Sequence, residues 1–112
     1  MGRTSRVLSA PVDTLLSPAD LDEAVAGLEG WSLVDGRLHL ELRFRDFADA
    51  FGFMVKVALA AEKLDHHPDW SNSWNRVTID IASHDAGGIT ARCIELAQRV
   101  STAAGPWAGL GE

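Results

Sequence analysis

The sequence predicts one α+β domain, in which helices gather on one face of an antiparallel sheet. Three observations support this fold class. The chain has 112 residues, enough for one small domain. Segments with helical periodicity and segments with strict alternation follow one another in the order helix, strand, strand, helix, strand, helix. Apolar residues make up 46% of the chain, which is ordinary for a protein with a packed core.

The composition limits the kinds of binding partner and the cellular compartment that we expect for this protein. The net charge of −6 argues against nucleic acid or an anionic membrane as a direct electrostatic partner. Cys93 is the single cysteine, so an intrachain disulfide is excluded and a reducing compartment is expected. No apolar run approaches the ~20 residues that cross a bilayer, and the N-terminal residues lack the apolar core of a signal peptide. We therefore expect a cytoplasmic protein.

The first helix is expected after an N-terminal tail of residues 1–16. Ser17 fits the N-cap position and Pro18 fits the first turn of the helix. Gly30 is suited to end it. Four apolar residues share one face at helical spacing: Leu21, Ala24, Val25 and Leu28.

Two strands joined by a tight turn are expected next. Residues 31–34 read as a short strand, and Asp35-Gly36 is a hairpin turn signal. Residues 38–45 then alternate between apolar and polar, which is typical of a half-buried antiparallel strand. His39 falls on the polar face of that strand. The apolar members are Leu38, Leu40, Leu42 and Phe44.

A second helix is predicted from its cap, Asp46, to about Asp65. Its apolar residues form one stripe at helical spacing, which we interpret as core packing. The stripe consists of Phe47, Ala50, Phe51, Met54, Val57, Ala58 and Ala61.

A further strand and a third helix complete the predicted domain, residues 17–105, before a C-terminal tail of residues 106–112. The strand covers residues 74–83, with Trp74 packed in the sheet. Thr90 fits the N-cap of the helix, whose apolar side is made by Cys93, Ala97, Val100 and Ala104. Three strands leave exposed edges. Either another strand lies around residues 70–74 or a sheet edge pairs with another subunit.

Three histidines lie just after predicted elements of this fold: two follow a helix and one follows a strand. His66 and His67 are followed at once by Pro68, which disfavours helical geometry in the residue before it. His84 follows the predicted strand of residues 74–83. A helix end and a strand end can bring three imidazoles into one pocket, and imidazole titrates near physiological pH. Such a cluster suits proton transfer.

Four interpretations of the histidines stay open on the residues alone. A zinc site with Cys93 as fourth ligand lacks an HExxH or CxxC pattern. A nucleophilic serine lacks a GxSxG elbow, although Ser71, Ser73 and Ser83 are near in sequence. The histidines can also be purely structural. The fourth interpretation is a metal-free acid–base site.

Several motifs favour the acid–base interpretation because of what they resemble. The run EKLDHHPDW is followed by N-x-W-N-x-V-x-I and then by SHDAGGIT. Upstream, DFADAFGFMVKVALAAEKLD precedes and includes the start of the histidine motif. Together these segments closely resemble the pterin-4a-carbinolamine dehydratase family. The resemblance covers roughly residues 17–100 and is highly specific.

The resemblance implies a fold and a reaction. The family fold is a four-stranded antiparallel sheet with three helices on one side, assembled as dimers or as tetramers through helix packing. The family dehydrates 4a-hydroxytetrahydropterin to quinonoid dihydropterin in tetrahydropterin recycling. It uses neither a metal nor an organic cofactor. Its substrate is the product that aromatic amino acid hydroxylases release, so such a hydroxylase is an expected partner in the same pathway.

The resemblance also implies the site residues. The catalytic histidines are His66, His67 and His84. The expected substrate-binding residues are Trp31, Glu62, Asp65, Trp70, Ala82, Ser83 and Asp85. Our hypothesis has His66 and His84 act as acids on the two faces of the pterin, while His67 orients the ring and accepts the N5 proton. Asp65 or Glu62 is expected to hold an imidazole in its working tautomer.

Two departures from the family pattern and one alternative function accompany this prediction. Cys93 stands where the family usually has an aspartate, and Ala82 stands where some relatives have a hydroxyl residue. We expect Cys93 to be a small buried hydrophobic residue. The alternative is a non-catalytic, oligomeric binding protein of the same fold, either a dimerisation cofactor or an assembly factor. An enzyme acting on a different pterin is a third possibility.

Overall fold

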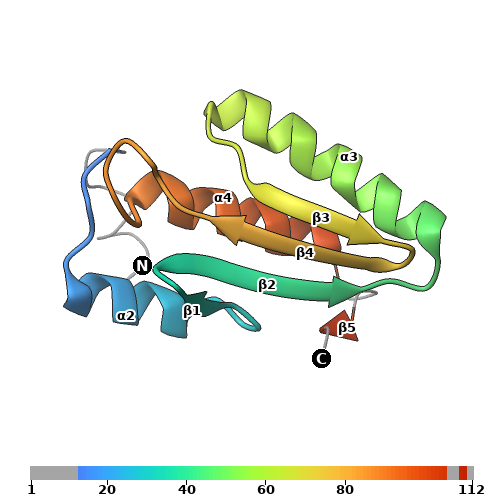
Figure 1. Ribbon diagram of the computed structural model, residues 1–112, viewed down its shortest axis with the longest axis horizontal. Helices are drawn as coiled ribbons and strands as arrows, with labels where there is room; N and C mark the ends of the chain where they lie inside the picture. The colour runs from blue at the N-terminus through green and yellow to red at the C-terminus, as the bar shows by residue number, and fades with distance from the viewer. Residues whose placement is uncertain (1–12, 106–108, 111–112) are drawn as a thin grey trace.

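An antiparallel sheet covered on one face by three helices forms the described part of the computed structural model, residues 13–105 and 109–110 (Figure 1). The helices are α2 (Pro18–Ala26), α3 (Phe47–Leu64) and α4 (Ala91–Ala104). The strands are β1 (Ser32–Val34), β2 (Arg37–Arg43), β3 (Asp69–Ser73), β4 (Arg76–Ile81) and the two-residue β5 (Gly109–Leu110). The predicted α+β class, with four main strands and three helices, is confirmed.

The four main strands lie in the order β1-β2-β4-β3. The central pair joins β2 to β4, from Leu38 opposite Ile81 to Arg43 opposite Arg76. β5 pairs with the end of β2, beyond the stretch that β1 covers. β3 is the strand that the sequence allowed around residues 70–74, so the first of the two explanations for the missing strand is confirmed.

Local signals in the sequence placed the helix starts and the first hairpin correctly. Each predicted N-cap side chain accepts a hydrogen bond from the backbone N–H three residues later, at 3.1 Å for Ser17, 2.8 Å for Asp46 and 3.4 Å for Thr90. Asp35 and Gly36 have positive φ angles of 53° and 77° in the β1–β2 turn. These values suit the tight turn that the Asp-Gly pair predicts.

The predicted end of the first helix was wrong by one turn. α2 ends at Ala26 with Gly27 as its C-cap, and Gly30 lies beyond it. The backbone N–H of Leu28 still bonds to Val25 O, which turns the Leu28 side chain into the core. The burial of Leu28 in the core therefore matters more for where the helix ends than the glycine at position 30.

Trp74 does not pack in the sheet, so this prediction was also wrong. Its side chain is 66% exposed, and its φ of 53° places it in the turn between β3 and β4. Its neighbour Asn75 is buried and donates from Nδ2 to Phe44 O at 2.8 Å. The buried amide, not the large ring, anchors this turn to the rest of the sheet.

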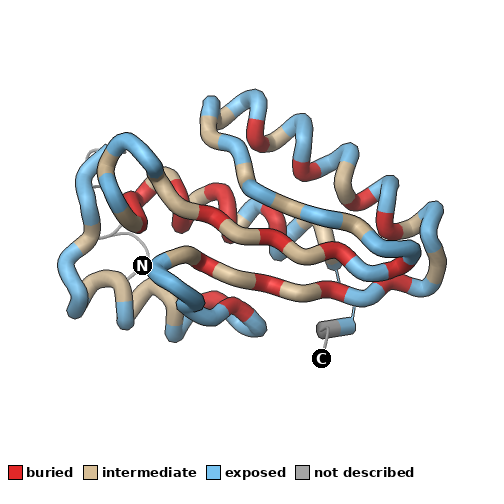
Figure 2. Tube along the Cα trace, viewed as in Figure 1, coloured by how far each residue is buried: buried red, intermediate tan, exposed pale blue. Residues whose placement is uncertain are grey.

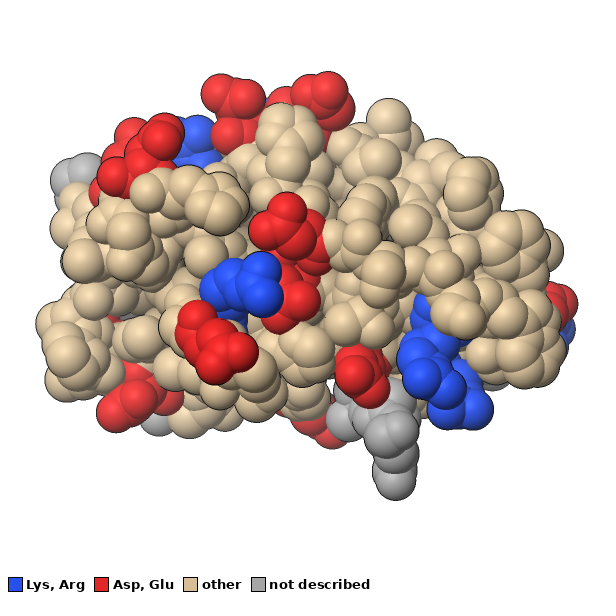
Figure 3. Space-filling model, viewed as in Figure 1, with Lys and Arg blue, Asp and Glu red and all other residues tan. Residues whose placement is uncertain are grey.

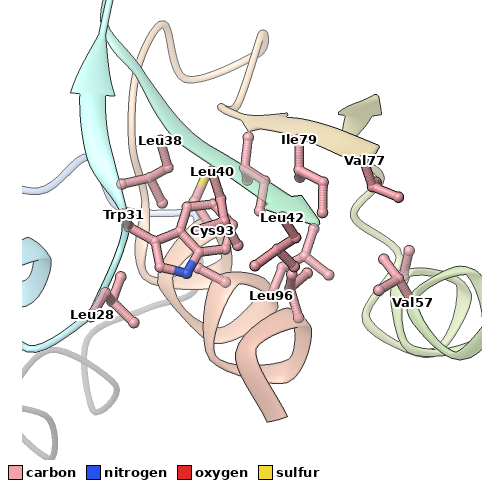
Figure 4. Packing of buried hydrophobic residues seen from close by; sticks show 14 of the residues in the cluster. Leu28, Trp31, Leu38, Leu40, Leu42, Val57, Val77, Ile79, Cys93 and Leu96 are labelled. Atoms are coloured by element: carbon pink, nitrogen blue, oxygen red, sulfur yellow. The ribbon is translucent and has the colours of Figure 1, made fainter. Parts of the chain in front are cut away.

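The core lies between the sheet and the helices. Along β2 and β4, buried side chains alternate with half-buried ones, as Figure 2 shows along these strands. Trp31 and Cys93 lie among the buried residues that Figure 4 draws between β2 and α4. The buried residues of α4 are Ala91, Cys93, Ile94, Leu96, Ala97 and Val100. α4 is thus the helix that closes the core.

α3 has two apolar faces, of which only one reaches the core. The inner face consists of Ala50, Phe53, Val57 and Ala61, all buried. The outer face of α3 consists of Phe47, Phe51, Val55 and Leu59, which are 50%, 53%, 47% and 68% exposed. The prediction that Phe47, Phe51 and Ala58 belong to the core was wrong, because the sheet can touch only one side of the helix. Among the described helices, α3 included, none is long and apolar enough to cross a membrane.

The face of the sheet away from the helices is charged and mixed in sign. Figure 3 shows acidic and basic side chains interspersed on the side seen in Figure 1. His39 Nδ1 lies 2.8 Å from Asp80 Oδ1, and an Arg37 nitrogen lies 3.8 Å from Asp69 Oδ2. The expected place of His39 on the polar face of its strand is confirmed.

Candidate active site

The end of α3 presents the first histidine. Asp65 caps the helix in the left-handed conformation, with φ 52° and ψ 44°. The next backbone N–H, that of His66, reaches back to Ala61 O at 3.0 Å. This ending satisfies the last carbonyl groups of the helix and turns the chain sharply. His66 therefore leaves the helix axis and points its ring toward α4, where it meets Cys93.

The first turn of α4 fastens this helix end. Arg92 donates from one guanidinium nitrogen to Leu64 O and Asp65 O, each at 3.3 Å. Its other terminal nitrogen lies 3.5 Å from Asp13 Oδ1. The guanidinium group thus satisfies carbonyl groups that the helix leaves unpaired at its C-terminus. The backbone just before His66 is held from the outside by a residue of a different helix.

A thiol and a hydroxyl lie behind the ring of His66. Cys93 Sγ is 3.3 Å from His66 Nε2. The same sulfur is 3.5 Å from Thr90 Oγ1, and Cys93 is fully buried. The expectation that Cys93 is buried is confirmed, but the thiol is also a polar neighbour of the candidate catalytic ring.

The surroundings of His66 disfavour its charged form. Burial lowers the pKa of the imidazole below the ordinary value of 6.5, and the positive charge of Arg92 and the neighbouring His67 lower this pKa further. The carboxylates of Asp13 and Asp65 oppose the shift without reversing it. Near neutral pH the ring is therefore the neutral imidazole, with one nitrogen that donates and one that accepts a hydrogen bond.

This depressed pKa makes a contribution to stability that depends on pH. Because the pKa of His66 is lower in the folded protein than in the unfolded chain, the unfolded state binds more protons as the pH falls below about 6.5. Folding stability is then lost as the pH falls through the folded pKa. We expect the free energy of unfolding to fall less steeply between neutral and mildly acid pH in His66→Gln than in the wild type. Urea unfolding at a series of pH values measures both slopes, and equal slopes would contradict the expectation.

A cavity of about 390 Å³ adjoins His66. It lies between the end of α3, the start of α4 and the loop after β4. This loop is closed by the backbone bond from Ser83 N to Gly88 O at 2.8 Å. The cavity is lined by Asp13, Asp65, His66, Ser83, Asp85, Ala86 and Arg92. Four of the predicted site residues therefore meet here: Asp65, His66, Ser83 and Asp85.

The other two predicted catalytic histidines lie outside the lining of this cavity. His67 is exposed, and its Nε2 lies 3.4 Å from Oε1 of the predicted site residue Glu62. His84 is 86% exposed on the loop after β4, and its Nε2 lies 3.9 Å from Asp69 Oδ2. Each of these two imidazoles thus has a carboxylate as its neighbour.

The predicted aromatic contacts fall in different places. Trp31 is buried in the core, where its indole N–H donates to Ser101 Oγ at 2.9 Å. It does not line the cavity beside His66. Trp70 in β3 and Ala82 after β4 are half-buried and pack against the core. A larger cavity of about 590 Å³ lies near the start of α3, around Asp49, and has no histidine in its lining.

Sequence reasoning missed one residue of the site, Arg92, which was not singled out. Cys93 was singled out as a departure from the family's usual aspartate, but it was expected to be a small buried hydrophobic residue. A partial signal existed, because Cys93 lies three residues after the N-cap Thr90, in the first turn of a helix whose start follows the His84 loop. Among the described residues, no group of three or more His, Cys, Asp or Glu side chains is arranged to hold a metal ion. The arrangement offers instead a neutral imidazole, two carboxylate-paired imidazoles and a polar cavity.

Comparisons with protein families, protein sequences and solved structures all find the same family. A family model described as pterin 4 alpha carbinolamine dehydratase matches residues 14–103. A protein of Solibacter usitatus, provisionally named a pterin-4-alpha-carbinolamine dehydratase, is 47% identical over 91 residues, covering 81% of this chain and 96% of the relative. A protein of Rhizobium rhizogenes with the same name is 48% identical over 91 residues, covering 80% and 90%. A crystal structure of a transcriptional coactivator/pterin dehydratase from Brucella melitensis is 44% identical with a TM-score of 0.79, covering 82% of this chain and 100% of that one.

Proposed function

Because the chain belongs to the pterin-4a-carbinolamine dehydratase family, we propose that it dehydrates a 4a-hydroxytetrahydropterin to quinonoid dihydropterin and water. The observation that carries the proposal is the half-buried, neutral His66 beside a polar cavity of about 390 Å³. Loss of the hydroxyl group is helped by a polar group that is held in place beside the leaving oxygen and can be reached by substrate. His66 meets both conditions, because contacts from Cys93 and Arg92 hold the ring and the backbone before it, and the cavity leaves the residue within reach of substrate.

The reaction requires one proton to leave the substrate and another to reach its oxygen. The N5–H bond breaks, the electron pair forms the C4a–N5 double bond, and the C4a–O bond breaks to release the hydroxyl group. We assign the N5 proton to His67 and the proton that completes the water molecule to His84. Each of these two imidazoles has a neighbouring carboxylate, Glu62 for His67 and Asp69 for His84, which can orient the ring.

The role of His66 changes from that in the sequence-based hypothesis. A ring whose pKa is lowered by burial and by Arg92 is not a cationic acid near neutral pH. It acts as a neutral hydrogen-bonding group beside the leaving oxygen, where a positioned donor stabilises the charge that develops in the transition state. Asp65, Ser83 and Asp85 supply the polar cavity wall that binds the bicyclic ring.

The pathway follows from the substrate. A 4a-hydroxytetrahydropterin is the product of aromatic amino acid hydroxylation, so we place the protein after such a hydroxylase in tetrahydropterin recycling. A cytoplasmic location fits the single cysteine of the chain, because one cysteine cannot form an intrachain disulfide.

Stopped-flow absorbance tests the proposal. Enzymatically generated 4a-hydroxytetrahydropterin is mixed with buffer or with micromolar wild-type protein, and its decay to quinonoid dihydropterin is followed. Faster decay with the protein supports the dehydratase. Equal decay rates would exclude this substrate and would favour the binding function considered next.

A second function is supported by the outer face of α3. Phe47, Phe51, Val55 and Leu59 are about half exposed or more, in a line along the helix. A contiguous apolar face of this kind marks an interaction site in a protein that folds in water. We propose that a second copy of this chain covers it, giving a homodimer or homotetramer. The Brucella melitensis neighbour is described as a transcriptional coactivator as well as a pterin dehydratase, so the same face is also our candidate for binding another protein.

A charge placed on the outer face of α3 should dissociate the assembly. In Phe51→Asp, a carboxylate replaces an exposed aromatic ring at the centre of this face, and burying it against a second copy would be costly. We expect a smaller particle than the wild type in sedimentation velocity at equal concentration. The control is Lys56→Glu, an exposed position on another side of the same helix. Unchanged particle size in Phe51→Asp would place the interface elsewhere.

A further inference from the structure

We propose that Cys93 is a positioning residue, whose thiol donates a hydrogen bond to His66 Nε2 and thereby keeps the ring proton of neutral His66 on Nδ1. The role in catalysis rests on the proposed dehydratase function, whereas the tautomer itself does not. The inference starts from a contact between two helices: Cys93 Sγ lies 3.3 Å from His66 Nε2, within reach of a thiol hydrogen bond.

The hydrogen atoms around the sulfur have one arrangement that uses every donor. Thr90 Oγ1 accepts the backbone N–H of Cys93 at 3.4 Å, so its own hydroxyl hydrogen is available for the sulfur at 3.5 Å. The thiol hydrogen is then directed to His66 Nε2. The reverse arrangement, with His66 donating to the sulfur and the thiol donating to Thr90, leaves the hydroxyl hydrogen of the buried Thr90 without one of these partners. Imidazole nitrogen is also a better acceptor than sulfur, which accepts only weakly.

The thiol is held rigidly enough to select a tautomer. Cys93 is fully buried in the first turn of α4, and Thr90 caps that turn. Arg92, its immediate neighbour, bonds to Leu64 O and Asp65 O, just before His66. One helical turn therefore holds both the backbone that leads into His66 and the ring nitrogen itself. Partners that occupy one ring nitrogen of a histidine determine the state of the other.

The tautomer determines which nitrogen of His66 can donate a hydrogen bond to the substrate. With Nε2 occupied by the thiol, the neutral ring has its N–H at Nδ1 and no free lone pair. His66 then donates a hydrogen bond to the leaving oxygen and does not compete with His67 for the N5 proton. A carboxylate in place of the thiol would accept a hydrogen bond from Nε2 and favour the charged ring. The uncharged thiol is therefore matched to a neutral His66.

Long-range ¹H–¹⁵N spectra of the labelled full chain, recorded where His66 is neutral, test the tautomer. We expect a protonated Nδ1 and an unprotonated Nε2 in the wild type. In Cys93→Ala the proton should move toward Nε2, and Cys93→Ser, which restores a donor, should retain the wild-type pattern. A wild-type His66 protonated at Nε2 would overturn the inference, even if a variant failed to fold. So would an unchanged pattern in folded Cys93→Ala.

Kinetics of the same proteins separate this inference from the proposed function. With 4a-hydroxytetrahydropterin as the substrate, Cys93→Ala is expected to lose about tenfold in kcat with little change in KM, by analogy with the loss of an outer partner of a metal-bound histidine. Cys93→Ser should recover most of the rate. Equal kcat values for an active wild type and Cys93→Ala would overturn the positioning role. An inactive wild type whose His66 carries its proton on Nδ1 would overturn the dehydratase function and support the tautomer assignment.

Discussion

Replacing His66 with alanine is expected to lower kcat/KM for the dehydration of 4a-hydroxytetrahydropterin about 10²–10³-fold, the usual cost of removing one positioned donor to the charge that develops in the transition state. The substitution removes the half-buried ring beside the cavity and leaves the thiol of Cys93 without its partner. KM should change less than kcat, because the lost interaction acts mainly on the oxygen that departs in the transition state. Stopped-flow traces at several substrate concentrations give both constants.

The matched control is His39→Ala. His39 is also a half-buried histidine with a hydrogen-bonding partner, Asp80 at 2.8 Å, but it lies on the sheet face away from the helices. Its replacement should leave kcat/KM nearly unchanged. The assignment of His66 fails if its alanine variant is folded and loses less than about threefold, far below what a positioned donor normally contributes. It also fails if the two variants lose activity equally.

Replacing Leu96 with alanine is expected to lower the free energy of unfolding by about 2–5 kcal/mol, the range for a large aliphatic residue removed from a packed core. Leu96 is completely buried on the side of α4 that faces the sheet. Removing most of its side chain leaves a cavity that the surrounding residues fill only in part. Urea unfolding followed by circular dichroism measures the change, at one protein concentration because assembly adds to apparent stability.

Leu33→Ala provides the comparison of the same chemical change at an open position. Leu33 lies in the edge strand β1 and is 39% exposed. Its replacement should cost less than about 1 kcal/mol, as is usual for substitutions outside the core. Equal losses for the two variants would mean that α4 does not carry the core in the way its burial indicates.

The features that could be predicted from the sequence are those that neighbouring residues decide. Ser17, Asp46 and Thr90 cap helices because their side chains reach a backbone N–H only three residues away. The alternation along β2 identifies its buried face because strand geometry has a period of two. The family resemblance then supplied the fourth strand, which the local patterns left open, whereas the three helices were already predicted from periodicity and caps.

The features that could not be predicted depend on which elements meet. Phe51 and Phe53 are equally apolar, yet only Phe53 faces the sheet, since the orientation of α3 is set by tertiary packing. The contact between Cys93 and His66 joins residues of different helices, and no spacing rule connects them. Trp31 was assigned to the pterin site by resemblance, whereas the structure shows its indole bonded to Ser101 in the core.

The pairing of β2 with β4 has a consequence for the way in which the chain folds. This central ladder joins Leu38 to Ile81, so α3 and β3 form a long loop between its two strands. The β3–β4 hairpin and α3 need only local contacts, whereas closing the loop costs chain entropy before any ladder bond repays it. We expect the local pieces to form early and the β2–β4 docking to limit the rate. The His66 cavity needs the end of α3, the loop after β4 and the start of α4 together, so a chain halted before that docking step would hold its helices without a working site.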